Sequence, residues 1–299
     1  MSVKGVLPVV PTPFLEGRFD EPSFARLIEH MSPGVDGFVL LGSTGEAPSM
    51  TTRERQEIAA AVLALTPAEM RVVVGVGHTS SDDAVELALH AQQHGAAAVL
   101  APAPFYFPNQ PDGVLAFLAR IDAVLDIDLV LYDNPPATKT VMRADSVVAW
   151  AGSLEHLVAV KLTDHDLTKI EPWHEAGLTV LGGDDPIAFR YMAAGVDGVM
   201  IIVPALCPSA FRCCWDLLQV GELDAAYAVF SSEILPITHA FGIGDEIATS
   251  KAILQEMGVF TSAEVRAPLI ASDPDRRRLL HSAMRAIAAA KGVAPGSTL

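Results

Sequence analysis

The chain has 299 residues, 51% of them hydrophobic and 19% charged, which is enough apolar sequence to bury a large core in one large domain or in a large and a small one. Its 36 acidic residues outnumber its 20 basic ones, so the formal net charge is −16. This charge repels phosphate backbones and anionic membrane surfaces, and no apolar stretch is long enough to span a bilayer. We therefore expect neither nucleic acid nor a membrane as a partner.

The cysteines and the amino terminus indicate a cytoplasmic protein. Cys207, Cys213 and Cys214 are odd in number and close together, and neighbouring cysteines such as the last two pair poorly with each other. They indicate no disulfide framework and fit a reducing compartment. The first five residues lead directly into a strand-like run without the long apolar segment of a secretory signal.

Short apolar runs alternate with segments of helical periodicity along the first two thirds of the chain. The runs lie at 5–10, 37–41, 72–76, 97–100, 128–132, 157–160, 178–181 and 198–202. Eight runs separated by helical segments are typical of a closed (β/α)8 barrel. An open doubly wound sheet could use the same alternation with fewer strands, but no G-x-G-x-x-G follows the first run.

The helical segments carry start and stop signals. The first helix is expected at about 22–31, and Thr51 with Glu54 has the spacing of a capping box for the second. The third should begin near Ser80 or Ser81 and end at His94, where Gly95 stops it. These signals support the division of the chain into βα units.

From about residue 208 onward the pattern is helical, with no further convincing strand. Helices are expected at 208–220, 222–240, 246–257 and 273–291, followed by a frayed tail at 292–299. We therefore predict an α/β fold, a (β/α)8 TIM barrel over residues 1–222 with a C-terminal helical extension over 223–299. The extension could lie against the barrel or form an oligomer contact.

Lys161 is the residue around which the chemistry is expected. It follows the apolar run 157–160, and strands of this buried type normally end in turn residues. Desolvation favours the neutral amine of a lysine, which can attack a ketone and form a Schiff base at the C-terminal end of a barrel strand. A surface lysine that ends a strand is the alternative explanation.

Other polar residues follow neighbouring strands. Tyr132 ends the fifth run, where its phenol could relay protons or simply lie at the barrel rim. Ser43 and Thr44 lie between two glycines, which let backbone N–H groups face an anion, and the following helix should point its N-terminus to the same place. A substrate carboxylate fits there, although an ordinary turn with a helix cap would have the same sequence.

The seventh and eighth runs supply further candidates for substrate binding. Gly183, Asp184 and Met200 are included, since each lies at or near the end of one of these runs. Asp184 could hold substrate hydroxyls, whereas a structural role is favoured for Asp185. The chain offers no cluster of His, Cys or carboxylates with metal-ligand spacing, so neither a metal nor another cofactor is expected.

In combination, these motifs resemble the dihydrodipicolinate synthase/N-acetylneuraminate lyase family of pyruvate-dependent class I aldolases, over nearly the whole chain. Each motif is weak alone, but their order is hard to obtain by chance. The matching segments are Pro11-Thr12-Pro13-Phe14, Gly42-Ser43-Thr44-Gly45-Glu46, Pro104-Phe105-Tyr106, Tyr132, Lys161, Gly183-Asp184-Asp185 and Lys251-Ala252-Ile253-Leu254.

The resemblance implies a metal-free lyase in which Lys161 forms an imine with pyruvate or another 2-keto acid. Tyr132 would then shuttle the proton, and Ser43 would link it to Tyr106, which in the synthases reaches in from a neighbouring subunit. The backbone amides of Ser43 and Thr44 would bind the pyruvate carboxylate. The resemblance thus implies a small-molecule substrate and a homo-oligomer, a tetramer or a dimer.

Two departures from the family pattern bear on the second substrate. Ala137 occupies the place where synthases carry an arginine for that substrate's carboxylate, and Lys139 lacks the planar fork of arginine. The stretch 201–204 is apolar where the sugar lyases place a serine. We therefore favour an aldolase or lyase acting on pyruvate and an unidentified aldehyde. The alternatives are the synthase proper, a metal-dependent aldolase and a non-catalytic barrel that binds a keto acid.

Overall fold

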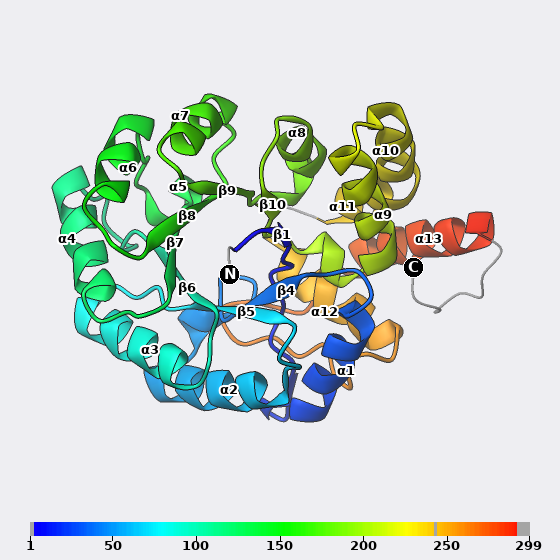
Figure 1. Cartoon of the computed structure of the whole chain (residues 1–299). Helices are drawn as coiled ribbons and strands as arrows, with labels where there is room; N and C mark the ends of the chain where they lie inside the picture. The colour runs from blue at the N-terminus through cyan, green and yellow to red at the C-terminus, as the bar shows by residue number, and fades with distance from the viewer. Residues whose placement is uncertain (1–2, 242–243, 292–299) are drawn as a thin grey trace.

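The computed structural model describes residues 3–241 and 244–291 and contains a parallel eight-stranded sheet surrounded by helices (Figure 1). The strand order is β1-β10-β9-β8-β7-β6-β5-β4. The strands are β1 (Gly5–Val6), β4 (Gly37–Leu40), β5 (Arg71–Gly75), β6 (Ala98–Pro102), β7 (Asp128–Asp133), β8 (Leu157–Leu162), β9 (Thr179–Gly182) and β10 (Gly198–Val199). The predicted (β/α)8 barrel with C-terminal helices is confirmed.

The barrel closes between β4 and the segment that follows β1. Val39 pairs with Val9 in a parallel bridge, its N–H donates to Pro8 O (2.8 Å), and Val10 N–H donates to Val39 O (3.1 Å). This pairing joins the two ends of the sheet, so no edge of the barrel is left open.

The first and last barrel strands are shorter than the predicted runs 5–10 and 198–202. Pro8 has no N–H to donate on the side that faces β4, while the N–H groups of Leu7 and Val9 still donate to Val199 O (3.0 Å) and Ile201 O (2.9 Å). After β10 the backbone N–H groups of Ile202 and Val203 donate to the carboxylate of Asp185 instead of to a neighbouring strand (2.8–3.1 Å). An aspartate side chain thus ends the eighth strand.

Helices alternate with the strands as the sequence predicted, and their ends carry the expected caps. Thr51 and Glu54 form the capping box of the second helix. Ser80 caps the third, and Gly95 follows that helix with φ +91°. The barrel helices are α1 (Glu21–Met31), α2 (Thr52–Leu65), α3 (Ser81–Gln93), α4 (Pro111–Asp122), α5 (Pro135–Thr138), α6 (Ala144–Ala151), α7 (Ile170–Glu175) and α8 (Ala188–Ala193).

A small hairpin precedes α1 and was not predicted. It pairs β2 (Phe14–Leu15) with β3 (Arg18–Phe19) in antiparallel register through a two-residue turn. Glu16 and Gly17 have φ values of +52° and +74°, as a type I′ turn requires. The Glu-Gly pair was the local signal for this turn.

The C-terminal region consists of α9 (Pro208–Gln219), α10 (Leu223–Val229), α11 (Leu235–Ala240), α12 (Glu246–Glu256) and α13 (Pro274–Lys291). The expected single helix at 222–240 contains a π-helical turn at Phe230–Ile234. Pro236 lies two residues after its end and lacks the N–H that an α-helix would use. The expected tail at 292–299 lies outside the described residues, and the boundary at 222 stays a prediction.

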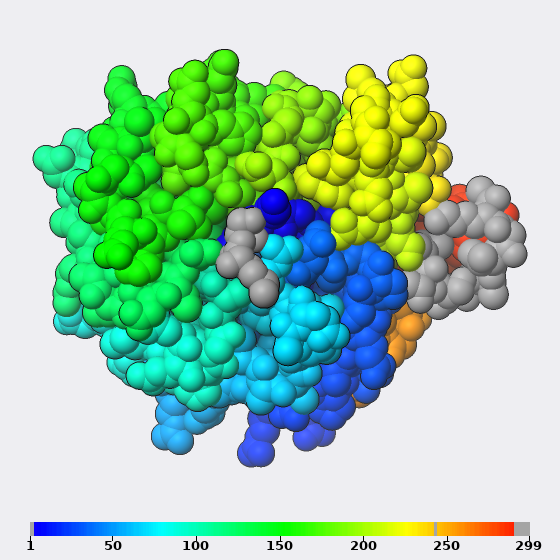
Figure 2. Space-filling view, viewed as in Figure 1, coloured from blue at the N-terminus to red at the C-terminus, as the bar shows by residue number. Residues whose placement is uncertain are grey.

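Apolar side chains fill the barrel interior and the layer between barrel and helices. The interior group includes Val39, Val73, Val130, Leu181 and Met200, all fully buried. In the space-filling view the N-terminal segment (dark blue) lies at the centre of one face and is ringed by later segments (Figure 2). None of the described helices combines the length and apolar character needed to cross a membrane.

Candidate active site

Lys161 and Tyr132 lie side by side on neighbouring strands. Lys161 in β8 is the register partner of Tyr132 in β7, and its Nζ lies 4.0 Å from the centroid of the tyrosine ring. Both side chains are buried, with exposed fractions of 3% and 8%. Because both strands are parallel and end here, the amine and the phenol meet at the C-terminal end of the barrel.

Lys161 differs from the other buried lysines in its partners. Lys169 donates to Asp133 (2.8 Å) and Asp164 (2.5 Å), and Lys251 forms an ion pair with Glu46 and donates to Glu264 O (2.7 Å). Lys161 Nζ makes no hydrogen bond or ion pair with any described residue and lies over the Tyr132 ring. A buried amine without a carboxylate partner is an expected feature of a nucleophile rather than of a structural ion pair.

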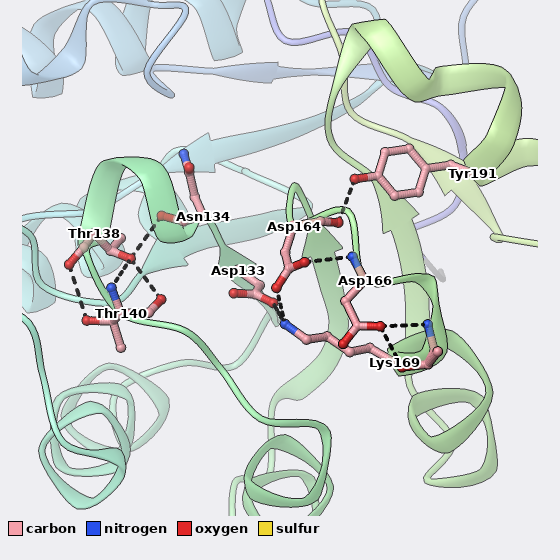
Figure 3. A network of polar contacts seen from close by, with 9 residues as sticks. Asp133, Asn134, Thr138, Thr140, Asp164, Asp166, Lys169 and Tyr191 are labelled. Atoms are coloured by element: carbon pink, nitrogen blue, oxygen red, sulfur yellow. Dashed lines mark hydrogen bonds and ion pairs between the residues drawn. The ribbon is translucent and has the colours of Figure 1, made fainter.

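The Lys169 network supports the ends of the two strands that carry Tyr132 and Lys161 (Figure 3). Asp133 directly follows Tyr132, Asp164 lies three residues after Lys161, and Lys169 joins their carboxylates. The Tyr191 hydroxyl donates to Asp164 O (2.9 Å). Burial raises the pKa of Asp133 to about 6, while the ion pair with Lys169 opposes this rise. Sequence analysis did not identify this network.

A second set of hydrogen bonds in Figure 3 fixes the short helix α5, which carries Ala137. Asn134 Oδ1 accepts from Ala137 N–H (3.3 Å), and the Thr138 hydroxyl donates to Asn134 O (2.9 Å). Thr140 in turn accepts from Asn109 N–H (3.0 Å), which ties this helix to the loop that carries Tyr106. Ala137 is therefore held on the wall of the site.

Ser43 and Thr44 follow β4 and lie on the opposite side of the cavity floor. Their backbone N–H groups donate to no acceptor in the described part of the chain, and both residues line the cavity above Lys161. A 3₁₀ turn (Ala47–Ser49) separates this loop from α2, whose first turn is closed by its own capping box. The loop amides are therefore the available donors, and the expectation that α2 points its N-terminus at the anion site stays a prediction.

Glycine at position 183 leaves room for the side chain of Lys161. A Cβ there would lie 2.9 Å from Lys161 Cε and 2.4 Å from Thr163 Oγ1. Asp184 lines the cavity and lies 2.7 Å from His165 Nε2. Burial is the largest cause that raises the pKa of Asp185 to about 6, while the backbone N–H groups it accepts lower it. These contacts agree with the structural role favoured for Asp185.

Two predicted site residues lie apart from the cavity. Met200 is fully buried in the barrel interior, where its N–H donates to Gly182 O (2.7 Å). Tyr106 is 72% exposed and packs against Phe107 in a T-shaped pair with ring centroids 4.8 Å apart. Neither is among the described residues that line the cavity around Lys161, so we expect any role of Tyr106 there to need a second copy.

A cavity of about 560 Å³ extends outward from Lys161. The C-terminal region forms part of its wall, which sequence analysis did not foresee, and the residues concerned are Thr238, Phe241, Gly244, Glu246 and Ile247. A smaller space of about 230 Å³ adjoins it behind Ser43 and Tyr132. Within the described residues, no group of three or more His, Cys, Asp or Glu side chains is arranged to hold a metal ion.

A sequence model of the Dihydrodipicolinate synthetase family matches residues 2–287, which is nearly the whole chain. The chain belongs to the dihydrodipicolinate synthetase family. It is therefore an enzyme of a lyase family, as the sequence motifs indicated.

Curated relatives and solved structures agree with this assignment. The 4-hydroxy-tetrahydrodipicolinate synthase of Hyphomonas neptunium is 28% identical over 94% of this chain and 97% of its own, and that of Methanocaldococcus jannaschii is 27% identical over 94% and 98%. Dihydrodipicolinate synthase from Thermotoga maritima has a TM-score of 0.89 at 25% identity, covering 95% of this chain and 98% of that one. A dihydrodipicolinate synthase variant described as monomeric also scores 0.89 at 25% identity, covering 95% and 96%.

Proposed function

We propose that this family member is a metal-independent class I lyase that forms a Schiff base between Lys161 and pyruvate or another 2-keto acid. The observation that carries the proposal is a buried lysine at the end of a barrel strand, unpaired and 4.0 Å from a tyrosine ring. The amine attacks the ketone carbon to form a carbinolamine, and loss of water then leaves an iminium ion. This ion makes the neighbouring methyl group acidic enough to form the enamine that attacks an aldehyde.

The surrounding groups have matching roles. The free amides of Ser43 and Thr44 would hold the keto acid's carboxylate, and Tyr132, whose hydroxyl has no hydrogen-bond partner in the described chain, would move protons to and from the carbinolamine. Gly183 leaves the space that the Lys161 side chain occupies, and Asp184 would face the part of the substrate that extends into the cavity. As a further part of the proposal, the enzyme acts in the cytoplasm, as its cysteines suggest.

A second candidate is 4-hydroxy-tetrahydrodipicolinate synthase itself, because the curated relatives carry that name. Ala137 on the cavity wall counts against it, since no described cationic side chain other than Lys161 lines the cavity to receive a second carboxylate. Turnover of pyruvate with aspartate semialdehyde separates the two candidates. Low turnover with that aldehyde, together with turnover of another, would favour the broader lyase.

Borohydride trapping tests the mechanism directly. Incubation with pyruvate and borohydride should fix one pyruvate-derived adduct on the peptide that contains Lys161 and abolish activity, and a chelator should not protect or inhibit. Lys161→Ala should lose adduct and activity while keeping its circular dichroism spectrum, and Tyr132→Phe should trap slowly. An adduct on Lys139, Lys169 or Lys251 would mean that Lys161 is not the reacting amine. Full activity without any adduct would overturn the Schiff-base mechanism.

A further inference from the structure

The outer part of the active-site cavity has an unbalanced charge. Of the described residues that line it, Lys161 at the floor is the only cationic one, whereas Asp184, Asp185 and Glu246 are acidic. Lys139, the nearest candidate by sequence, directs its Nζ to Tyr106 O at 3.4 Å and does not line the cavity. The carboxylates must therefore be compared by the partners that each of them has.

Two of the three carboxylates are already engaged. Asp185 accepts the N–H groups of Ile202 and Val203 (2.8–3.1 Å), and Asp184 lies 2.7 Å from the ring nitrogen of His165. Glu246 has no hydrogen bond or ion pair with any described residue. Of the three carboxylates, Glu246 is therefore the one whose negative charge no hydrogen-bond donor or cation of the described chain offsets.

The position of Glu246 suits a retained negative charge. It is the first residue of α12, and the positive end of a helix dipole favours an acidic side chain in the first turn. Lys251 in the same helix forms the buried ion pair with Glu46, just after the loop that carries Ser43. The helix that presents Glu246 is thereby fastened to the barrel beside the keto-acid site.

The rest of the outer wall is mostly apolar. Its hydrocarbon surface comes from α5, the end of the eighth strand and the C-terminal region, through Pro136, Ala137, Ile202, Phe241 and Ile247. An apolar group transferred from water into such surroundings is stabilised, whereas a carboxylate would lose hydration and gain no cationic partner.

We propose that the second reactant is an aldehyde with an apolar body and no carboxylate, and that Glu246 is a specificity-determining residue that rejects anionic partners. This inference rests on the proposed function, because it assumes that the keto acid occupies Lys161 and that the second reactant fills the outer cavity. In this proposal Glu246 acts only through its negative charge and takes no part in making or breaking bonds.

Two keto acids of the same heavy-atom shape provide the test, since each extends from the imine into the outer cavity. They are 5-methyl-2-oxohexanoate, which ends in an isopropyl group, and 2-oxoglutarate, which ends in a carboxylate. The half-saturating concentration for borohydride trapping at Lys161 is measured for each by mass spectrometry, relative to pyruvate in the same protein. The wild-type protein should prefer the acid with the isopropyl end by about tenfold or more, since one additional like charge at close range in a partly buried site has effects of this size.

Glu246→Gln should reduce this preference by about threefold to tenfold, because the change removes one charge and keeps the shape. Glu29→Gln makes the same charge change on the exposed face of α1, outside the cavity, and should leave the preference as it is. Equal trapping of both acids by the wild-type protein, or an unchanged preference in Glu246→Gln, would overturn the inference alone. Absence of any pyruvate adduct would instead overturn the proposed function, and the inference with it.

Discussion

The α-carbon of Gly183 lies against the side chain of Lys161, so that a Cβ at position 183 would approach Lys161 Cε to 2.9 Å. The same Cβ would meet Thr163 Oγ1 at 2.4 Å and Leu162 O at 3.0 Å. Real Cβ atoms do not approach other atoms this closely, so the lysine would have to move. The glycine therefore sets where the amine can lie.

Gly183→Ala should slow imine formation about tenfold or more, because displacement of a reacting group by about 1 Å has effects of up to a hundredfold. Overpacking should lower the free energy of unfolding by about 1–3 kcal/mol. Stopped-flow or timed borohydride quenching measures the first effect and urea denaturation the second. Gly152→Ala is the matched control, since its Cβ would meet only Ala149 O, at 3.6 Å, and wild-type imine kinetics in Gly183→Ala would refute the argument.

Ala137→Arg should raise kcat/KM for an aldehyde that bears a carboxylate by roughly tenfold, because Ala137 lines the cavity and arginine would supply a charge-assisted hydrogen bond. Ala137→Met adds similar bulk without charge and serves as the control. The measurement is steady-state turnover of pyruvate with aspartate semialdehyde. Efficient turnover of that aldehyde by the wild-type protein would contradict this interpretation of Ala137.

The ion pair between Lys251 and Glu46 should affect stability because each buried charge compensates the other. Both side chains are buried, burial lowers the pKa of Lys251, and Arg266 N–H donates to Glu46 (2.7 Å). Lys251→Met should cost about 3–5 kcal/mol of unfolding free energy, because it leaves an uncompensated carboxylate in the core. The double variant Glu46→Gln/Lys251→Met should recover much of that loss.

Urea denaturation of wild type, Glu46→Gln, Lys251→Met and the double variant gives the coupling energy of this pair. All four are measured at one fixed protein concentration, because an oligomer's stability depends on it. Additive effects of the two substitutions would show that the side chains do not interact. Loss of pyruvate trapping in Lys251→Met, with the fold retained, would indicate in addition that α12 supports the loop of Ser43.

The free energy of unfolding should fall as the pH rises from about 4 to about 6, because Asp185 loses its proton over this range. Burial raises the pKa of Asp185 from 3.8 to about 6 in the folded protein, so the folded state binds its proton more tightly than the unfolded chain does. The contribution of this group is fully present below about pH 4 and is lost as the pH rises to about 6. The difference in unfolding free energy between wild type and Asp185→Asn should shift accordingly over this range, with Asp224→Asn on α10 as the control for loss of one charge. A pH-independent difference would rule out this titration.

Assembly remains a prediction that rests on Tyr106. This residue and Phe107 are 72% and 70% exposed and present an aromatic pair to solvent in one chain. We expect a homotetramer or dimer by light scattering at micromolar concentration, and Tyr106→Ala should lower both association and activity. Tyr227→Ala changes another exposed tyrosine and is the control. A monomer with full activity would refute a role for Tyr106 across subunits.

The sequence by itself determined the fold class and the central pair of the site. Periodicity locates the strands, and parallel barrel strands bring their C-terminal ends together, so Tyr132 and Lys161 must meet once both are placed at strand ends. The predicted helix caps at Thr51 and Ser80 were confirmed for the same reason, since capping depends on residues only a few positions apart.

Only the tertiary structure decided which buried lysine is free. Lys161, Lys169 and Lys251 are all buried, and the last two are neutralised by carboxylates up to 205 positions away (251 − 46). Likewise, Glu246 reaches the cavity because the C-terminal helices pack against the open end of the barrel. Charge compensation and cavity shape depend on distances in space between residues that the chain's local periodicity does not relate, and for that reason they appear only when the chain is folded.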